Sequence, residues 1–226
     1  MDTNANTNTN APASRDFYMG VDLGQAQDYT AIVVLGVSAN NAADGQADEY
    51  HVGHCERLPL GTSYESVTQH IKKLIAIWTQ YNQNITLVVD ATGVGRPVID
   101  MMRAEGLDPV PVIITTGYSE TRDGNWWHVP KRDLVAVPNV LLGKKQLKIV
   151  QGIPFADVLI TELHNFRVKA NIAGHDSYEA WREGDHDDLV LAVSLACWYA
   201  FKQKKESISD VGLTWGTIRK RPDLMY

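Results

Sequence analysis

Short apolar runs rich in β-branched residues alternate along this chain with longer segments of helical periodicity. The short runs predict strands, and the turn between the first two predicts a hairpin. Helices are predicted where apolar residues recur at three- and four-residue spacing, as Val67, Ile71, Leu74 and Trp78 do. The predicted strands are 17–23, 29–37, 49–58, 85–89 and 110–115, and the predicted helices are 63–81, 97–105, 131–142, 155–168 and 187–204.

The order of these elements predicts an α/β fold. Three strands in a meander are followed by helix, strand, helix, strand and further helices, which favours a mixed sheet with helices packed on it. Residues 118–127 are predicted to form an irregular loop. Residues 1–16, composed mostly of Asn, Thr, Ala, Ser and Pro, predict a disordered tail. We therefore expect one globular domain over 17–205 and a C-terminal tail over 206–226.

Composition narrows the functional class only a little. The chain has 226 residues, of which 44% are apolar and 21% charged, as in ordinary globular domains. With only two cysteines, the sequence predicts no disulfide framework, and we expect a reducing compartment, with neither a signal peptide nor a membrane span. The net charge of -6 argues against a general nucleic-acid binder. It does not exclude a nuclease, because clustered carboxylates lower the charge and bound metal ions reverse it locally.

Asp22 is the first candidate for chemistry, because it interrupts an apolar strand. Side chains alternate across a strand, so Gly20, Asp22 and Gly24 are predicted to share one face. A carboxylate buried there is costly unless it is paired or bound to a metal. The two glycines would leave room for a metal and a phosphate. The alternative is that Asp22 caps the hairpin turn, although Gly24 and Asp28 already suit that turn.

Two further acidic positions stand at element boundaries. Asp90 ends the most buried predicted strand, and the carboxyl ends of strands are where sites form in α/β sheets. Alternatively, Asp90 satisfies backbone N–H groups at the start of a helix. Asp187 and Asp188 open an apolar helix, where the helix dipole alone would stabilise acids. With Asp185 nearby, these acids exceed what a cap requires, and a divalent cation would relieve their repulsion.

Taken together, the three acidic positions favour phosphodiester hydrolysis with two divalent cations. That chemistry needs several carboxylate oxygens converging on ions about 3.5–4 Å apart. Mg²⁺ or Mn²⁺ suits such oxygen ligands. One ion generates hydroxide from water and the other stabilises the leaving 3′ oxygen, so no covalent nucleophile is needed.

Three segments carry a resemblance to a known family. GVDLGQAQDYTAIVVL (20–35), LVVDATGVGRPVIDMM (87–102) and GDHDDLVLAVSLA (184–196) resemble, in the same order, the nuclease domain of the large terminase subunit of tailed bacteriophages. The resemblance spans residues 17–205. It implies a ribonuclease H-like fold with a central five-stranded sheet, in which the first and fourth strands are adjacent. Asp22 and Asp90 would then lie side by side, with Asp188 brought to them and Asp187 as an auxiliary ligand.

The resemblance also implies roles around this metal site. Asp28 would lie close to the metals or face them as a further acid, and Lys131 would lie near the DNA. His186, directly before the two acids, is another candidate for a place beside the metals and is also compatible with a junction resolvase. Basic clusters that contain Lys131, Arg132, Lys144 and Lys145 are candidate phosphate contacts, although each is also consistent with a solvated surface.

The implied activity is a DNA endonuclease that cuts concatemeric viral DNA during genome packaging in the cytoplasm of an infected bacterium. The implied partners are double-stranded DNA and an ATPase motor, a small terminase subunit and a portal supplied by other chains. The chain has no G-x-x-x-x-G-K-[ST] loop, so we expect an excised domain, a separately encoded nuclease or a relative without the motor.

Other interpretations of the sequence stay open. The segments 20–31 and 90–95 also resemble phosphate loops of actin-like and sugar-kinase-like ATP-binding proteins, which leaves the acids of 187–188 unexplained. A Holliday-junction resolvase of the related fold, or a non-catalytic docking module, is a further alternative. His51, His54 and Cys55 have zinc-binding chemistry but no second pair at a suitable spacing, so they predict ordinary strand residues.

Overall fold

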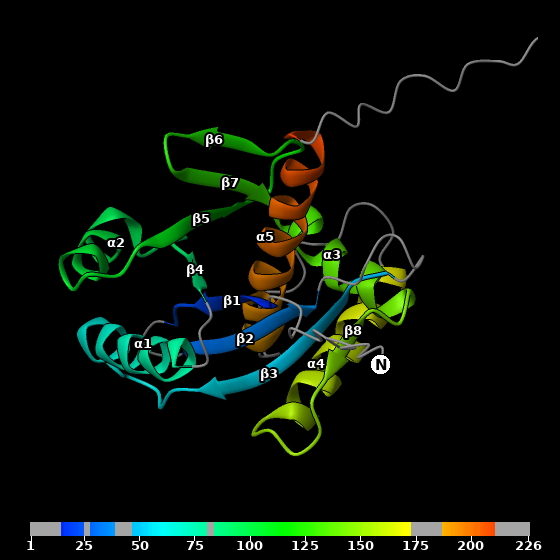
Figure 1. Ribbon diagram of the computed structural model, residues 1–226, viewed down its shortest axis with the longest axis horizontal. Coiled ribbons are helices and arrows are strands. Elements are labelled where there is room, and N and C mark those ends of the chain that lie inside the picture. Colours follow the sequence, from blue (N-terminus) through cyan, green and yellow to red (C-terminus); the bar gives the residue numbers. More distant parts are fainter. Residues whose placement is uncertain (1–14, 25–27, 39–46, 81–83, 173–186, 211–226) are drawn as a thin grey trace, which may run out of the picture.

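A mixed sheet of eight strands organises the part of the chain that the structure describes, in the order β6-β7-β5-β4-β1-β2-β3-β8 (Figure 1). The structure is a computed structural model, and it describes residues 15–24, 28–38, 47–80, 84–172 and 187–210. The strands are β1 (Arg15–Asp22), β2 (Ala31–Ser38), β3 (Glu49–Arg57), β4 (Ile85–Asp90), β5 (Pro109–Thr115), β6 (Thr121–Asp123), β7 (Trp126–Pro130) and β8 (Leu147–Ile149).

The strand directions confirm the predicted mixed sheet. β1, β2 and β3 form an antiparallel meander, and β4 lies parallel to β1 on its other side. β5 and β7 continue the parallel part, and β6 is antiparallel to β7. The first and fourth strands are therefore neighbours, as the resemblance implied. β2 lies inside this sheet between β1 and β3, and its first six residues are all buried, because helices cover both of its faces.

Helices cover the two faces of the sheet in two separate groups (Figure 1). α1 (Tyr64–Thr79) and α2 (Gly95–Ala104) pack on the face that carries Met19, Val21 and Leu87. α3 (Lys131–Gly143), α4 (Ala156–Ile172) and α5 (Asp188–Asp210) pack on the face that carries Tyr18, Val33 and Val52. Because side chains alternate along each strand, Asp22 and Asp90 point to the face covered by α5.

The close approach of α5 to β1 depends on Gly20. A Cβ built on Gly20 would lie 1.9 Å from the carbonyl oxygen of Ala192, which is far inside a normal contact. The absence of a side chain therefore lets the backbone of α5 lie directly on the strand. The sequence interpretation that Gly20 leaves space for a metal and a phosphate is wrong, because helix backbone fills that space.

The structure departs from the predicted elements in several places. Residues 118–127, predicted as a loop, contain β6 and the start of β7, and β8 was not predicted. The sheet thus has eight strands in the described chain where five were expected. Residues 15–16 belong to β1 and residues 206–210 to α5, so both predicted tails overlap secondary structure. Among the described helices, none has the length and apolar character that crossing a membrane requires.

Candidate carboxylate site

Two aspartates meet at the carboxyl ends of the parallel strands β1 and β4. Val21 pairs with Val89 in the sheet register, and Asp22 and Asp90 each follow directly. Their side chains interact, since each affects the pKa of the other. Asp90 is buried, and Asp22 is partly covered. The sequence predicted a strand end at Asp90 but placed Asp22 inside its strand, whereas in the structure both residues end their strands, side by side.

The pKa values of Asp22 and Asp90 are both raised, because the two acids lie close together and are poorly hydrated. Burial raises the pKa of Asp22 well above its usual range, and the charges of Asp90, Asp187 and Asp188 raise it further. Burial also raises the pKa of Asp90, to about 6, although Thr92 and Lys131 act in the opposite direction. Two carboxylates this close repel each other, which favours protonation of one of them.

A local turn fixes the orientation of Asp90. Its Oδ1 accepts a hydrogen bond from the backbone N–H of Thr92 at 2.8 Å. The hydroxyl of Thr92 accepts in turn from the backbone N–H of Ile114 on β5, at 2.7 Å. The N-cap of α2 is Val94, so Asp90 does not cap that helix. The carboxyl group is thus held by the strand end and faces Asp22.

Asp187 and Asp188 stand at the start of α5, where the helix crosses the ends of the central strands. The backbone carbonyl of Asp187 accepts the first helical hydrogen bond, from Leu191 at 2.9 Å. Asp188 is 6% exposed, so its carboxylate lies inside the structure rather than on a solvated helix end. Both charges act on the pKa of Asp22, which places all four predicted acids in one electrostatic cluster.

Two basic side chains, Lys131 and Arg57, belong to this cluster. Lys131, the first residue of α3, donates from Nζ to Asp187 Oδ2 at 3.0 Å. Arg57, the last residue of β3, donates from Nε to Asp188 Oδ2 at 2.6 Å and from Nη2 to Asp188 Oδ1 at 2.7 Å. Arg57 Nη2 also donates to Glu162 on α4. Burial raises the pKa of Glu162 to about 7, although the Arg57 guanidinium lowers it.

Sequence reasoning missed Arg57 and Glu162. Glu162 precedes the buried Leu163 on α4, and an acid at the edge of an apolar helix face is a weak signal. The strand register places Arg57 near the acids, because Arg57 pairs with Ala31 and Ala31 pairs with Asp22. That row of residues across the sheet depends on pairing between distant segments.

The other predicted site residues have different positions. Asp28 is exposed, and His186 lies outside the described residues. Arg132 donates to the backbone carbonyl of Tyr118 and stacks on that ring at 5.0 Å. Lys144 and Lys145 are exposed beyond the far end of α3, about 20 Å along the helix from Lys131 at 1.5 Å per residue. The structure thus brings Lys131 to the acids and leaves these two lysines away from them.

The donor chemistry of the cluster fits divalent cations. The cluster contains five carboxyl groups and only two basic side chains, Arg57 and Lys131. Carboxylate oxygens are the ligands that Mg²⁺ and Mn²⁺ prefer. As they stand, no three Asp, Glu, His or Cys side chains of the described residues are arranged to hold a metal ion. Arg57 and Lys131 occupy oxygens of Asp188 and Asp187. A bound cation would therefore share these oxygens with the two basic residues.

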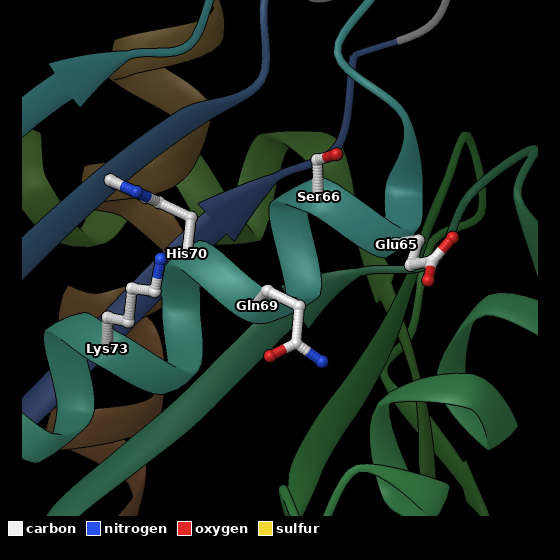
Figure 2. A pocket seen from close by; sticks show the side chains of 5 residues that line it. All are labelled: Glu65, Ser66, Gln69, His70 and Lys73. Atoms are coloured by element: carbon white, nitrogen blue, oxygen red, sulfur yellow. The ribbon is translucent and has the colours of Figure 1, made fainter.

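A surface hollow and a histidine group lie on the opposite face of the sheet. The hollow is lined by residues of α1, and Figure 2 shows their side chains projecting from that helix: Glu65, Ser66, Gln69, His70 and Lys73. His70 Nε2 lies 2.7 Å from Glu56 Oε1, and His54 Nε2 lies 3.3 Å from the same oxygen. Burial acts to raise the pKa of Glu56, but the two histidines outweigh it and lower that pKa. This face is separated by the sheet from the carboxylate cluster.

Comparisons with known proteins agree with the fold. No protein-family model and no curated protein matches this chain. Among solved structures, it is similar to the large terminase nuclease from thermophilic phage G20c, with a TM-score of 0.51 and 20% identity over 80% of this chain and 81% of that one. It is also similar to the Mn-soaked human cytomegalovirus terminase nuclease domain, with a TM-score of 0.51 and 15% identity over 84% of this chain and 86% of that one.

These similarities define the class of the fold. The mixed sheet with helices on both faces is ribonuclease H-like, as predicted. More particularly, the chain has the fold of terminase nuclease domains, which agrees with the resemblance of the three sequence segments.

Proposed function

We propose that this chain is a metal-dependent DNA endonuclease of the terminase type, which hydrolyses phosphodiester bonds with two divalent cations. The observation that carries the proposal is the placement of Asp22 and Asp90 side by side at the ends of two adjacent parallel strands, together with the buried Asp188 at the start of α5. The fold agrees with this proposal, and the cytomegalovirus domain of similar fold was soaked with Mn.

The residues of the chain would divide the work as follows. Asp22, Asp90 and Asp188 would hold the cations, and Asp187 would add a further carboxylate at the same helix start. When bound, the cations would activate a water molecule and neutralise the charge that develops on the phosphate. Lys131 would stand at the rim, because its ammonium group lies 3.0 Å from Asp187 and can also attract a phosphate.

The overall negative charge fits a domain that receives its substrate from other proteins. With a net charge of -6, the chain would hold double-stranded DNA weakly and with strong salt dependence. We therefore propose that an ATPase motor, a small terminase subunit and a portal, all on other chains, deliver the DNA in the cytoplasm of an infected bacterium.

Plasmid cleavage tests the proposal directly. We expect the protein to nick and linearise supercoiled DNA with Mn²⁺ or Mg²⁺ and to be inactive in EDTA, and Asp22→Asn to be inactive in all conditions. A four-way DNA junction and ATP are tested in parallel. Preference for the junction would point to a resolvase, and ATP binding without any cleavage would contradict the nuclease.

The pH dependence of Mn²⁺ binding provides a second prediction. Metal ligands must be ionised, and burial raises the pKa values of both Asp22 and Asp90, the latter to about 6. Protons therefore compete with the ion below that pH, and affinity should rise with pH. We expect binding to weaken by about tenfold or more between roughly pH 7 and pH 5, since each unit below a pKa lowers the ionised fraction about tenfold. Calorimetric titration with Mn²⁺ measures this, and an affinity independent of pH would argue against these ligands.

A further inference from the structure

Arg57 holds the carboxylate of Asp188 in a geometry that fixes its orientation. Nε and Nη2 donate to the two different oxygens of Asp188, at 2.6 and 2.7 Å. Two parallel hydrogen bonds between a planar guanidinium and a planar carboxylate set both the position and the plane of the acid. A single ion pair would set the distance alone.

Glu162 completes a closed set of contacts from a third element. Its Oε1 accepts from Arg57 Nη2, and its Oε2 accepts from the backbone N–H of Val190 at 3.3 Å. The N–H of Val190 belongs to the first turn of α5, where helical N–H groups have no partner within the helix. Glu162 therefore caps α5 and holds Arg57 at the same time, so that α4, β3 and α5 meet around Asp188.

Burial and contacts on several sides restrict the movement of the Arg57 side chain. The side chains of Arg57, Glu162 and Asp188 are only 13%, 10% and 8% exposed. The guanidinium carbon also lies 5.2 Å from the ring centre of Tyr29, as in a cation–π contact. A cation confined on three sides orients its partner and is poorly placed to leave when another cation arrives.

The sheet register places this group beside the paired aspartates. Arg57, Ala31 and Asp22 occupy one row across β3, β2 and β1, and their side chains share the face covered by α5. Neighbouring strands lie about 4.8 Å apart, so the backbones of Arg57 and Asp22, two strands apart, are separated by about 10 Å. Ala31 is small and lies between them. Asp188 thus bonds to Arg57 at one end of this row, and its charge acts on Asp22 at the other end.

We propose that Arg57 and Glu162 are positioning residues, which hold Asp188 and the first turn of α5 in the arrangement that binds the divalent cation. This proposal rests on the proposed function, because it assumes that Asp188 is a metal ligand. Groups that orient metal ligands typically contribute about 10–100-fold to metal affinity or activity.

Three variants test the proposal on the full chain: Arg57→Lys, Arg57→Gln and Glu162→Gln. Arg103→Gln on α2 is the matched control, because Arg103 forms an ion pair with Asp100 on the opposite face of the sheet. Mn²⁺ affinity is measured by calorimetry without DNA, cleavage is measured at saturating Mn²⁺, and melting temperatures in EDTA report folding. If Arg57→Gln fails to fold, the other two variants decide the question.

We expect Mn²⁺ binding or cleavage to fall by about 10–100-fold in each folded variant and to stay unchanged in the control. Arg57→Lys should not restore function, since an ammonium group cannot make the two parallel hydrogen bonds. Wild-type values in all three variants would overturn the proposal, and so would tighter Mn²⁺ binding by Arg57→Gln, which would mean that Arg57 competes with the ion. If the wild-type protein neither binds Mn²⁺ nor cleaves DNA, the proposed function itself fails, and this proposal fails with it.

Discussion

Asp90→Asn should abolish metal-dependent DNA cleavage and, at the same time, stabilise the metal-free protein. Loss of one ligand removes several kcal/mol of transition-state stabilisation, which lowers the cleavage rate by a factor of about a thousand or more. Asn keeps an Oδ1 that can accept the hydrogen bond from Thr92, so the turn after β4 should persist. The loss of activity would therefore come from the missing charge rather than from a changed backbone.

The gain in stability follows from the raised pKa values. Burial raises the pKa of Asp90 to about 6 and that of Asp22 well above its usual range, so the folded state binds protons more tightly than the unfolded chain. Stability from these groups is present below the unfolded pKa and is lost as pH rises through the folded one. Near neutral pH, Asp90→Asn avoids that loss, which amounts to about 1–3 kcal/mol at about 1.4 kcal/mol per pKa unit.

Thermal unfolding in EDTA over a range of pH measures this effect. The difference between Asp90→Asn and wild type should be small near pH 4 and grow toward pH 7, because only the wild-type acid becomes charged. Asp100→Asn is the control, since Asp100 is an exposed acid on α2. A metal-free Asp90→Asn protein that is less stable than wild type at neutral pH would contradict the electrostatic account. The charged acids would then stabilise the metal-free folded protein instead of destabilising it.

The main features of this site could be predicted because they depend on local sequence. Asp22 and Asp90 end strands whose apolar residues are contiguous, and those strands are adjacent and parallel in the structure. Asp187 and Asp188 precede a long apolar helix, and the structure places that helix on β1. The roles of these acids as metal ligands stay predictions. What local sequence indicated was an acid inside one apolar strand, at Asp22, and acids at two element boundaries, at Asp90 and at Asp187 and Asp188.

The features that were missed depend on contacts between distant segments. Arg57 reaches the cluster because β3 pairs with β2 in a register interrupted by an irregularity between Val34 and Leu35. β6 and β8 have three residues each, too few to show a period of two. Gly20 was interpreted as space for a ligand, because nothing in a strand sequence indicates that a helix will approach so closely. Each of these depends on the packing of the whole sheet.

Gly20→Ala should therefore lower both stability and activity, although Gly20 carries no functional group. Its new Cβ would meet the carbonyl oxygen of Ala192 at 1.9 Å and the backbone nitrogen of Ala196 at 3.0 Å. Backbone atoms of a helix cannot rotate away as a side chain can, so α5 must shift as a unit. Overpacking of this kind costs about 1–3 kcal/mol or more. In a domain of this size that loss corresponds to a melting temperature lower by about 3–10 °C.

The same shift should slow cleavage, since Asp188 stands at the start of α5. A displacement of about 1 Å at a catalytic group can cost about a hundredfold in rate. Gly143→Ala at the end of α3 is the matched control, because a Cβ there meets nothing within 4 Å. The control should keep wild-type cleavage and a similar or slightly higher melting temperature. Wild-type stability and cleavage in Gly20→Ala would mean that α5 does not rest on β1 at this point. The placement of Asp188 beside Asp22 would then need another explanation.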